Sequence, residues 1–431
     1  MRDKEIENLL KKEEARQKRV VNLIASENVV SDDVREALGS VCVNKYAEGY
    51  PGKRYYGGNE VSDEIERTCQ ARARALFGLK ESEWSVNVQP LSGSPANLAV
   101  YLALVPPGGS PSQNASAEQG KIMGMELAHG GHLTHGHKVS ASGIFWKQVS
   151  YCVSRDTETI DYDALLKLAK KEKPALVVAG FTAYPRAIDF KKFRKIADAA
   201  ACPELGRRGA YLLVDMSHIA GLVASGAHPS PFPYADVVTT TTHKSLRGPR
   251  SAIIFARKSE IRNPKSETNP KFQIPNSKFT IAEAIDKAVF PGLQGGPHVN
   301  QIAAVAVALK EAAEPAFKKY AQQVVKNAQA LAEELSLHGW RVISGGTDTH
   351  LVLVDTWMDG RGIGGKEAGE RLENEGIIVN KNAIPFDTRP PADPSGIRLG
   401  TPAETTRGAK EKDMRALALR IDKILSSRSK V

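Results

Sequence analysis

Four short apolar runs, separated by segments with helical spacing, limit the folds open to this chain of 431 residues. The runs are residues 121–127, 175–180, 211–215 and 237–241, and the helical segments among them are 161–173 and 189–201. Strands that are buried on both faces and joined by helices form a mostly parallel sheet. The sequence therefore predicts an α/β fold in which helices cover both faces of a central sheet.

The pattern changes along the chain and divides it into three regions. Residues 1–45 are an N-terminal arm that starts with a charged helix, and residues 46–297 contain the runs just described. Beyond them come helical patterns over 299–337, strand patterns at 341–346 and 350–355, and a helix at 366–375. We expect a large α/β domain at 46–297 and a smaller C-terminal α+β domain at 298–431.

The chain is basic, because 59 lysines and arginines face 49 aspartates and glutamates, for a formal charge of +10. Residues 244–287 hold ten Lys and Arg against four Asp and Glu, and they include a lysine-rich loop at 263–278. Such an excess favours anionic ligands. Since no zinc finger, RNP string or basic helix with base-reading spacing occurs, we expect small anions rather than nucleic acid. With 41% hydrophobic residues, the composition excludes disordered and collagen-like classes.

Cysteine spacing and the apolar stretches predict the compartment. The four cysteines lie far apart without a C-x-x-C pair, as expected of reduced thiols in a cytoplasmic protein; they are Cys42, Cys69, Cys152 and Cys202. No stretch approaches the about 18 apolar residues of a membrane span. The first residues lack the apolar core of a secretory signal and form a charged helix instead. Ile6, Leu9 and Leu10 lie on one side of this helix and would pack on a neighbour such as a second subunit.

Polar residues follow two of the predicted strands, at the position where open α/β sheets bind ligands. Asp215 ends one strand, and Lys244 follows the next. Pyridoxal phosphate needs both residue types, because a lysine forms a Schiff base with it and a carboxylate holds a proton on its ring nitrogen. His243 and Arg250 would favour the neutral, reactive amine of Lys244. The alternatives are a surface lysine and an aspartate in a turn or cap, but the pair together favours the cofactor.

The phosphate of such a cofactor needs an anion site. Ser92, Gly93 and Ser94 precede a helical run, and backbone N–H groups at a helix N-terminus bind phosphate. Serine also caps ordinary helices, so this pattern alone is weak. Residues 294–296, Gln-Gly-Gly, are open to the same role.

The segment 127–137 contains four histidines, His129, His132, His135 and His137. A metal site there lacks accompanying cysteines or carboxylates, and the paired glycines at 130–131 predict a turn rather than a helix face with two ligands. We therefore expect no metal. An imidazole stacked on an aromatic cofactor ring suits the segment better.

Strings along the whole chain resemble those of the serine hydroxymethyltransferase family. They are LIASEN (23–28), NKYAEGYPGKRYYGG (44–58), NVQPLSGSPAN (87–97), AHGGHLTHG (128–136), VDMSHIAGLV (214–223), VVTTTTHK (237–244), FPGLQGGP (290–297), ISGGTDTH (343–350), VNKN (379–382) and SGIRLGTPA (395–403). The resemblance implies a fold-type I, aspartate-aminotransferase-like enzyme that uses pyridoxal phosphate. The implied reaction moves the hydroxymethyl carbon of L-serine reversibly to tetrahydrofolate, and yields glycine and 5,10-methylenetetrahydrofolate.

The resemblance also implies roles at the matching positions. Lys244 would form the Schiff base with the cofactor, and Thr241 and His243 would help its exchange. Asp215 would pair with the ring nitrogen, and His132 would stack on the ring. The other cofactor contacts implied are His218, Ser94, Gly93, Thr182 and Arg250, with Tyr46 and Gly296 from a partner subunit.

The amino acid and the folate would bind to further residues of the matching strings. Ser26 and Arg398 would bind the carboxylate of serine, for which a planar guanidinium is well suited. Glu48 and Tyr56 would reach the reacting carbon across a dimer interface, with Glu48 handling the proton. Without the resemblance, Glu48 reads as a salt-bridged surface residue beside Lys45 and Lys53. The folate site would comprise Glu48, Leu127, Gly131, His132, Leu133 and Asn382.

The resemblance implies a homodimer with shared active sites, or a dimer of dimers. One rival is a threonine-aldolase-like enzyme that cleaves β-hydroxy amino acids without folate. It would share the lysine, the aspartate and the phosphate site, but not the strings at 44–58 and 379–382. An inactive homologue is disfavoured, because each position that does chemistry in the family is filled.

Overall fold

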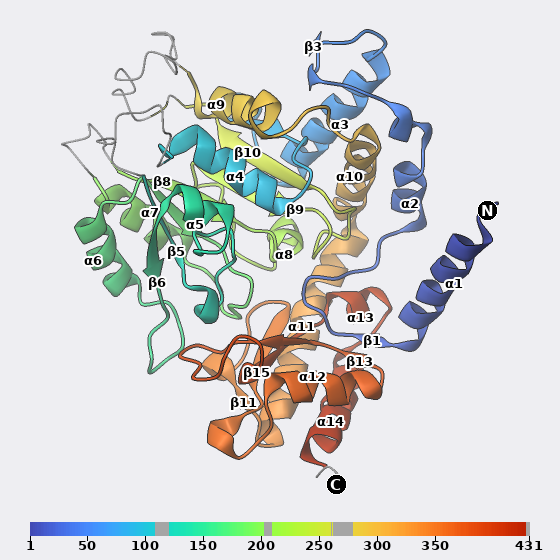
Figure 1. Ribbon diagram of the computed structural model, residues 1–431, viewed down its shortest axis with the longest axis vertical. Coiled ribbons are helices and arrows are strands. Elements are labelled where there is room, and N and C mark those ends of the chain that lie inside the picture. Colours follow the sequence, from blue (N-terminus) through green and yellow to red (C-terminus); the bar gives the residue numbers. More distant parts are fainter. Residues whose placement is uncertain (108–119, 202–208, 260, 262–278, 428–431) are drawn as a thin grey trace. The chain divides into compact units, whose positions relative to one another are not determined.

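The computed structural model in Figure 1 describes residues 1–107, 120–201, 209–259, 261 and 279–427. Most of the loop expected at 106–120, all of the loop at 263–278, and Cys202 lie outside these described residues. The chain forms two compact units: one contains Met1–Val29, Ala183–Arg186 and Gln322–Val431, and the larger contains Val30–Thr182 and Ala187–Ala321. The domain bounds expected from the sequence stay a prediction.

The larger unit is built on a seven-stranded sheet. In spatial order its strands are β4 (Trp84–Asn87), β10 (Ala252–Arg257), β9 (Val237–Thr241), β8 (Tyr211–Asp215), β7 (Leu176–Ala179), β5 (Lys121–Met125) and β6 (Lys147–Tyr151). Strand β10 runs antiparallel to both of its neighbours, and the other pairs are parallel. The mostly parallel sheet is therefore confirmed, and the four apolar runs of the sequence are β5, β7, β8 and β9.

Helices cover both faces of this sheet, as predicted. On one face, alternate strand residues such as Leu176 and Ile254 form a core with α4 (Gly93–Leu104) and α9 (Ile281–Lys287). On the other, Phe255 packs edge-on against Phe77 at the end of α3 (Glu60–Leu76), with ring centroids 5.3 Å apart. Apolar side chains pointing both ways explain why these strands read as continuous apolar runs.

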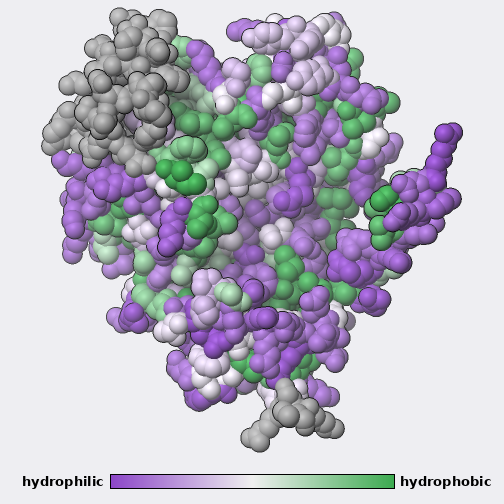
Figure 2. Space-filling view, viewed as in Figure 1, coloured by the Kyte–Doolittle hydropathy of each residue, from purple (hydrophilic) through white to green (hydrophobic). Residues whose placement is uncertain are grey.

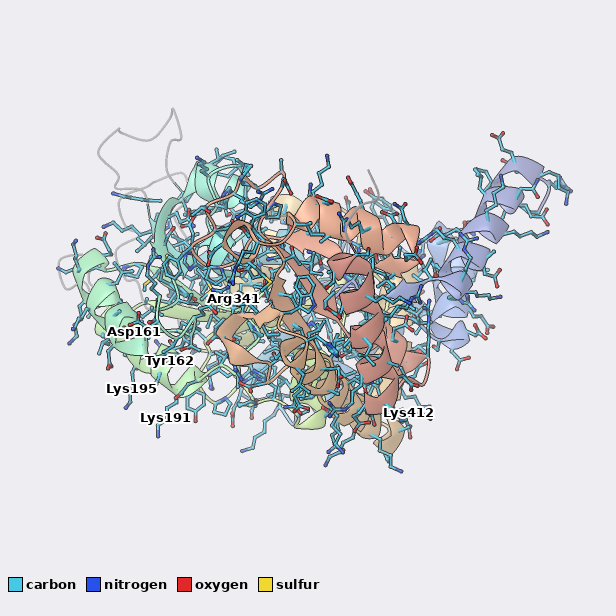
Figure 3. All side chains as sticks on the ribbon, turned by 90° about the horizontal axis from the view of Figure 1, so that it is seen from below. Asp161, Tyr162, Lys191, Lys195, Arg341 and Lys412 are labelled. Carbon is cyan, nitrogen blue, oxygen red and sulfur yellow. The ribbon has the colours of Figure 1, made fainter. Side chains whose placement is uncertain are left out.

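The helices between the strands begin at polar caps. The predicted helices are α6 (Tyr162–Glu172) and α7 (Phe190–Ala199), and Figure 3 labels residues on both. The Asp161 carboxylate caps α6, and the Asp189 carboxylate accepts from the backbone N–H of Lys192 in α7. The remaining elements of this unit are α2 (Asp32–Leu38), η1 (Val41–Asn44), β2 (Gly49–Tyr50), β3 (Lys53–Arg54), η2 (Leu127–His129), α5 (Ala141–Phe145), α8 (Ala220–Ser225), η5 (Ala288–Leu293) and α10 (Val299–Ala312).

The other unit is α+β. Its antiparallel sheet has the order β11 (Arg341–Val342), β12 (Leu351–Asp355), β15 (Gly396–Gly400) and β14 (Asn380–Asn382). Around it lie α1 (Lys4–Arg19), β1 (Val21–Asn22), α12 (Gly365–Asn374), β13 (Ile377–Ile378), α13 (Pro402–Thr406), α14 (Glu411–Ser426) and most of α11 (Pro315–Leu337). The strand expected at 341–346 is wrong beyond Val342, because Ser344, Gly345 and Gly346 take positive φ angles and turn the chain. None of the described helices combines the length and apolarity that crossing a membrane requires.

A buried carboxyl couples the stability of the larger unit to pH. The Asp286 side chain on α9 accepts from Asn87 Nδ2 (2.7 Å), and its backbone carbonyl accepts from the Tyr50 hydroxyl (2.6 Å). Burial raises the pKa of Asp286 from 3.8 to about 6, and this effect outweighs the hydrogen bond from Asn87. The folded chain therefore keeps a proton that the unfolded chain loses as the pH rises from about 4 to about 6.

Replacing Asp286 with asparagine should stabilise the protein at neutral pH. The wild type loses stability as the pH rises through this interval, whereas Asp286→Asn carries no such penalty and keeps an acceptor for Asn87. We expect a gain of about 1–3 kcal/mol above pH 7 that vanishes below about pH 4. Calorimetric melting at both pH values measures it, and a shift of equal size at both would contradict the assignment.

Candidate active site

Lys244 lies in the turn that follows β9. Its side chain is half-buried, and Nζ donates to Thr241 Oγ1 (3.0 Å) at the end of the strand. The next residue anchors the turn, because Ser245 Oγ donates to the His218 carbonyl (3.0 Å) and accepts from the Gly221 N–H (2.9 Å). The lysine is therefore held at the carboxyl edge of the sheet.

The neighbouring His243 is neutral at physiological pH. Burial, followed by the charges of Lys244 and Arg250, lowers the pKa of His243 to about 3. Its Nδ1 atom is buried and finds no hydrogen-bond partner among the described residues. A buried ring nitrogen without a partner is costly, and this is the condition that a bound ligand would relieve.

Asp215 ends β8, the strand beside β9. Its Oδ2 accepts from Asn97 Nδ2 (2.9 Å) and lies 3.1 Å from His135 Nε2, and its Oδ1 accepts from the Ser217 hydroxyl (2.6 Å). Burial alone would raise the pKa of Asp215, but the hydrogen bonds and the charge of His135 outweigh it and hold this pKa well below its usual range. The carboxylate also accepts from the Ser217 backbone N–H (3.1 Å), so the turn expected as an alternative is present as well.

The N-terminus of α4 packs against the end of β9, the strand that precedes Lys244. A Cβ atom on Gly93 would lie 2.8 Å from Thr241 Cγ2, so only glycine lets the helix approach this closely. Ser92 precedes the helix, but its side chain makes no capping hydrogen bond, which disfavours the simple cap considered above. Ser94 is exposed in the first turn. Backbone N–H groups at such an end suit a phosphate.

The histidine-rich segment joins the Asp215 network. His132 Nδ1 lies 2.7 Å from Thr134 Oγ1, and that hydroxyl accepts from Asn97 Nδ2 (3.0 Å), which also reaches Asp215. The rings of His132 and His135 are 5.6 Å apart. Within the described part of the chain, no three His, Cys, Asp or Glu side chains gather in a manner that would hold a metal ion.

The residues expected at the folate site border this segment. Leu127 and Leu133 are exposed, and a Cβ atom on Gly131 would collide with the Met125 carbonyl. The Thr182 backbone N–H donates to the Gly130 carbonyl (2.8 Å), which fixes the turn before His132. Asn382, also expected there, lies on β14 of the other unit, and its Nδ2 donates to the Ala383 carbonyl (2.6 Å).

A second group of predicted residues gathers at the β2–β3 hairpin. The Tyr46 hydroxyl donates to Glu48 Oε1 (3.0 Å), and the rings of Tyr46 and Tyr56 meet edge-on with centroids 5.5 Å apart. A Cβ atom on Gly296 would lie 3.3 Å from Tyr46 Cε2. Among the described residues no lysine or arginine forms an ion pair with Glu48, so the salt-bridged alternative is not observed.

Arg398 lies on β15 in the α+β unit. The side chain is buried, and Nε donates to Asn380 Oδ1 (3.0 Å) on the neighbouring β14. Burial lowers the pKa of Arg398 to about 10, so it stays charged at neutral pH. Ser26 follows Ala25, which packs so closely on Gly400 of β15 that a Cβ atom there would collide with it.

Three partners of Asp215 were missing from the predicted site: Asn97, His135 and Ser217. His135 lies 80 residues from Asp215 in sequence, and Asn97 lies 118 residues away. The sequence signal for His135 is its place in the histidine-rich segment, whose pattern predicts a ring stacked on a cofactor rather than a partner of Asp215. Ser217 is two residues from Asp215, a spacing typical of an Asx turn.

Comparison with known proteins gives a consistent result. A family profile described as serine hydroxymethyltransferase matches residues 1–421. The serine hydroxymethyltransferase of Acidobacterium capsulatum is 51% identical over 427 residues, and that of Koribacter versatilis is 52% identical over 427; each match covers 99% of this chain and 89% of the relative. The enzyme of the same name from Desulfotalea psychrophila is 50% identical over 425 residues, with the same coverage.

Both the sheet topology and the family match define the class as the fold-type I pyridoxal-phosphate-dependent transferases. Because the match extends over nearly all of the sequence at about half identity, the chain belongs to the serine hydroxymethyltransferase family. The resemblance of its strings is thus confirmed. Enzymes of this family use pyridoxal phosphate, with tetrahydrofolate as co-substrate.

The residues present fit this cofactor. Asp215 is ionised and its side chain is 11% exposed, which suits a protonated pyridine nitrogen. Gly93 brings a helix N-terminus to the same strand end as Lys244, which suits a phosphate. His243 Nδ1, which has no hydrogen-bond partner in the described part of the chain, is a polar position beside the lysine that a ligand would satisfy.

Proposed function

We propose that this chain transfers the hydroxymethyl carbon of L-serine to tetrahydrofolate, with Lys244 and Asp215 at the centre of its cofactor site. The observation that carries this assignment is the ionised carboxylate of Asp215 on β8, one strand from the β9 end that bears Lys244. The chemistry that bound pyridoxal phosphate supplies is an electron sink for the bond broken at the α-carbon of the amino acid.

Each part of the cofactor has candidate residues. Lys244 provides the attaching amine, Asp215 holds the proton on the ring nitrogen, and His132 covers the ring. The other candidates are Gly93 and Ser94 for the phosphate, with Tyr46 and Gly296 from a second subunit; His218 for the phenolic oxygen; Thr182 near the ring; and Thr241, His243 and Arg250 around the lysine. The neutral state of His243 supports a role in proton exchange near the Lys244 amine.

Ser26 and Arg398 bind the carboxylate of serine in this proposal. A guanidinium whose Nε is held by Asn380 has a fixed plane, which favours paired hydrogen bonds to a carboxylate. Burial strengthens such a charge-assisted bond, because water is excluded from it. The amino acid is thereby oriented before any bond breaks.

Glu48 moves the proton at the serine hydroxyl and at N5 of folate, and Tyr56, whose ring meets that of Tyr46, reaches the reacting carbon with it. Among the residues that the structure describes, the Glu48 carboxylate accepts a hydrogen bond from the Tyr46 hydroxyl and forms no ion pair, so it keeps capacity for such a transfer. Leu127, Gly131, Leu133 and Asn382 would line the folate.

The overall proposal is tested by following serine cleavage with and without tetrahydrofolate. We expect glycine to form rapidly only when tetrahydrofolate is present, together with the one-carbon folate product. Rapid cleavage of β-hydroxy amino acids with no stimulation by tetrahydrofolate would overturn the proposal and indicate a threonine-aldolase-like enzyme.

Replacing Glu48 with glutamine should slow the folate-dependent reaction by about 10²–10⁴-fold, because a general acid–base group is removed. Cofactor absorbance and glycine affinity should stay at wild-type values, since the amide keeps the size of the side chain. Glu60→Gln, an exposed change at the start of α3, is the matched control and should retain full turnover. Unchanged turnover in Glu48→Gln would refute the role of Glu48.

We further propose that the protein is a cytoplasmic homodimer in which each subunit contributes to the other's site. Exposed apolar side chains surround the hairpin: Val41, Val43, Tyr46, Tyr55 and Tyr56. Helix α1 has no buried residue and exposes Ile6, Leu9 and Leu10, and Figure 2 shows a green patch on this helix, at the right of the view. Sedimentation of a single monomeric species would contradict the proposed dimer.

The cysteines support the proposed compartment. The described cysteines, Cys42, Cys69 and Cys152, are free thiols, as expected in a reducing compartment.

A further inference from the structure

One buried side chain holds the backbone on both sides of Glu48. Arg54 Nη1 donates to the Ala47 carbonyl (2.8 Å) and to the Gly49 carbonyl (2.5 Å). The carbonyl of Glu48 itself accepts from the Tyr55 N–H (3.1 Å). Three successive carbonyl groups are therefore fixed, and the direction in which the Glu48 side chain leaves the backbone is fixed with them.

Arg54 is in turn held by two carboxylates of α3. Nε donates to Asp63 Oδ1 (2.8 Å), and Nη2 donates to Glu66 Oε2 (2.7 Å). The Arg54 side chain is 4% exposed and that of Glu66 is 2% exposed. Charge-assisted bonds in such a buried place are strong and directional, so the guanidinium plane cannot turn without breaking several of them.

Gln89, which follows β4, adds a second support. Its Nε2 donates to the Gly49 carbonyl (3.0 Å) and to Glu66 Oε1 (2.9 Å). The backbone carbonyl of Gln89 accepts from Gln294 Nε2 (2.9 Å). Gln294 precedes Gly295 and Gly296, the two glycines against which Tyr46 packs. Both sides of the Tyr46–Glu48 pair are thus tied to one network.

The hairpin conformation also depends on Gly49. Its φ angle is +93°, which favours glycine, and a Cβ atom there would collide with the Lys53 carbonyl. The close approach of the two strands lets a single guanidinium reach the carbonyls of residues 47 and 49 from residue 54.

We propose that Arg54 is the positioning residue for the proton transfer by Glu48, supported by Asp63, Glu66 and Gln89. This inference rests on the proposed role of Glu48 and goes beyond it, because none of these four side chains touches the substrate in the proposed function. We call Arg54 and its hydrogen bonds to the Ala47 and Gly49 carbonyls the clamp. A displacement of about 1 Å in a catalytic group can cost about 10²-fold in rate, so the clamp acts on catalysis through geometry.

The chain offers a matched control in Arg67. This side chain also pairs with Asp63, with Nη2 3.6 Å from Oδ2, but it is exposed. Within the described residues it donates no hydrogen bond to Ala47 or Gly49. Arg67→Lys therefore changes the environment of the Asp63 carboxylate and leaves the clamp unchanged.

The main test compares Arg54→Lys with Arg67→Lys in the holoenzyme. Lysine keeps the charge, but one ammonium group does not span two carbonyls and two carboxylates. We expect kcat for serine with tetrahydrofolate to fall by about 10–100-fold in Arg54→Lys. Glycine affinity and cofactor content should stay at wild-type values, and Arg67→Lys should retain wild-type kcat. Wild-type kcat in Arg54→Lys would overturn the proposal.

A double-mutant cycle separates positioning from a general structural role. If Arg54 acts through Glu48, the double variant Glu48→Gln with Arg54→Lys should be no slower than Glu48→Gln alone. Losses that multiply would overturn the proposal. If Glu48→Gln keeps wild-type turnover, the proposed role of Glu48 is wrong. If Glu48→Gln is slow but Arg54→Lys keeps wild-type turnover, only the positioning role of Arg54 is wrong.

Two further measurements are independent of turnover or of how well Arg54→Lys folds. Hydrogen exchange at the Tyr55 amide, which bonds to the Glu48 carbonyl, should be faster in Arg54→Lys and unchanged in Arg67→Lys. Exchange at the wild-type rate in both would overturn the proposal. Gln89→Leu removes one bond to Gly49 and keeps Arg54, so it should give a smaller fall in kcat; wild-type kcat and exchange there would also count against the clamp.

Discussion

Turnover of serine should fall by about 10³-fold or more when Lys244 is replaced with alanine, since the group that attaches the cofactor and exchanges it with substrate is lost. The variant should still fold, because Ser245 anchors the turn through its hydrogen bonds to the His218 carbonyl and the Gly221 N–H. Melting temperature and sedimentation check the fold, and stopped-flow assays with serine and tetrahydrofolate measure the rate.

A second readout for Lys244 does not depend on turnover. Borohydride treatment of the wild type, followed by peptide mass analysis, should leave the cofactor covalently on the peptide that contains Lys244. In Lys244→Ala no peptide should retain it. Lys258→Ala, an exposed lysine just after β10, is the matched control and should behave as wild type. Retention of the cofactor on another lysine in the wild type would refute the assignment.

The strands at the centre of the sheet could be predicted because consecutive residues of each strand are buried. Except at Asp215, β7, β8 and β9 are buried at every residue, so each appears as a run of apolar and threonine residues. Short strands carry no such signal: β14 is Asn-Lys-Asn, and β1 has two residues. β1 pairs with β13 at the other end of the chain, and β14 pairs with β15 across a loop; neither composition nor periodicity predicts these pairings.

The candidate site divides in the same way. Asp215 and Lys244 could be predicted because ligands of an open α/β sheet lie at the carboxyl ends of its strands. The partners that keep Asp215 ionised, Asn97 and His135, come from α4 and from the loop after β5, and only the folded sheet brings them together. The sequence does not predict the role of Arg54 for a related reason. Arg54 binds the backbone carbonyl groups of residues 47 and 49, and every residue type has such a group, so the sequence contains no signal for these contacts.

The second large effect concerns Asp215 itself. Asparagine at this position keeps the shape and the acceptor oxygen but removes the negative charge that would hold a proton on the pyridine nitrogen. We expect kcat to fall by about 10²–10³-fold in Asp215→Asn, as for the loss of other preorganised electrostatic partners, and the cofactor to bind more weakly. Cofactor titration by absorbance measures the binding without turnover.

Asp236 provides the matched control for loss of a buried carboxylate as such. It precedes β9, its side chain is 3% exposed against 11% for Asp215, and it accepts from Arg194 Nη1 (2.7 Å) and the Leu212 N–H (2.8 Å). Asp236→Asn should lower the melting temperature, because it weakens a buried ion pair, and yet bind cofactor as the wild type does. Asp215→Asn should show the opposite pattern, with weak cofactor binding and a smaller change in melting temperature of the apoprotein. If both variants bound cofactor normally, the charge of Asp215 would serve the fold, through His135 and Asn97, rather than the cofactor.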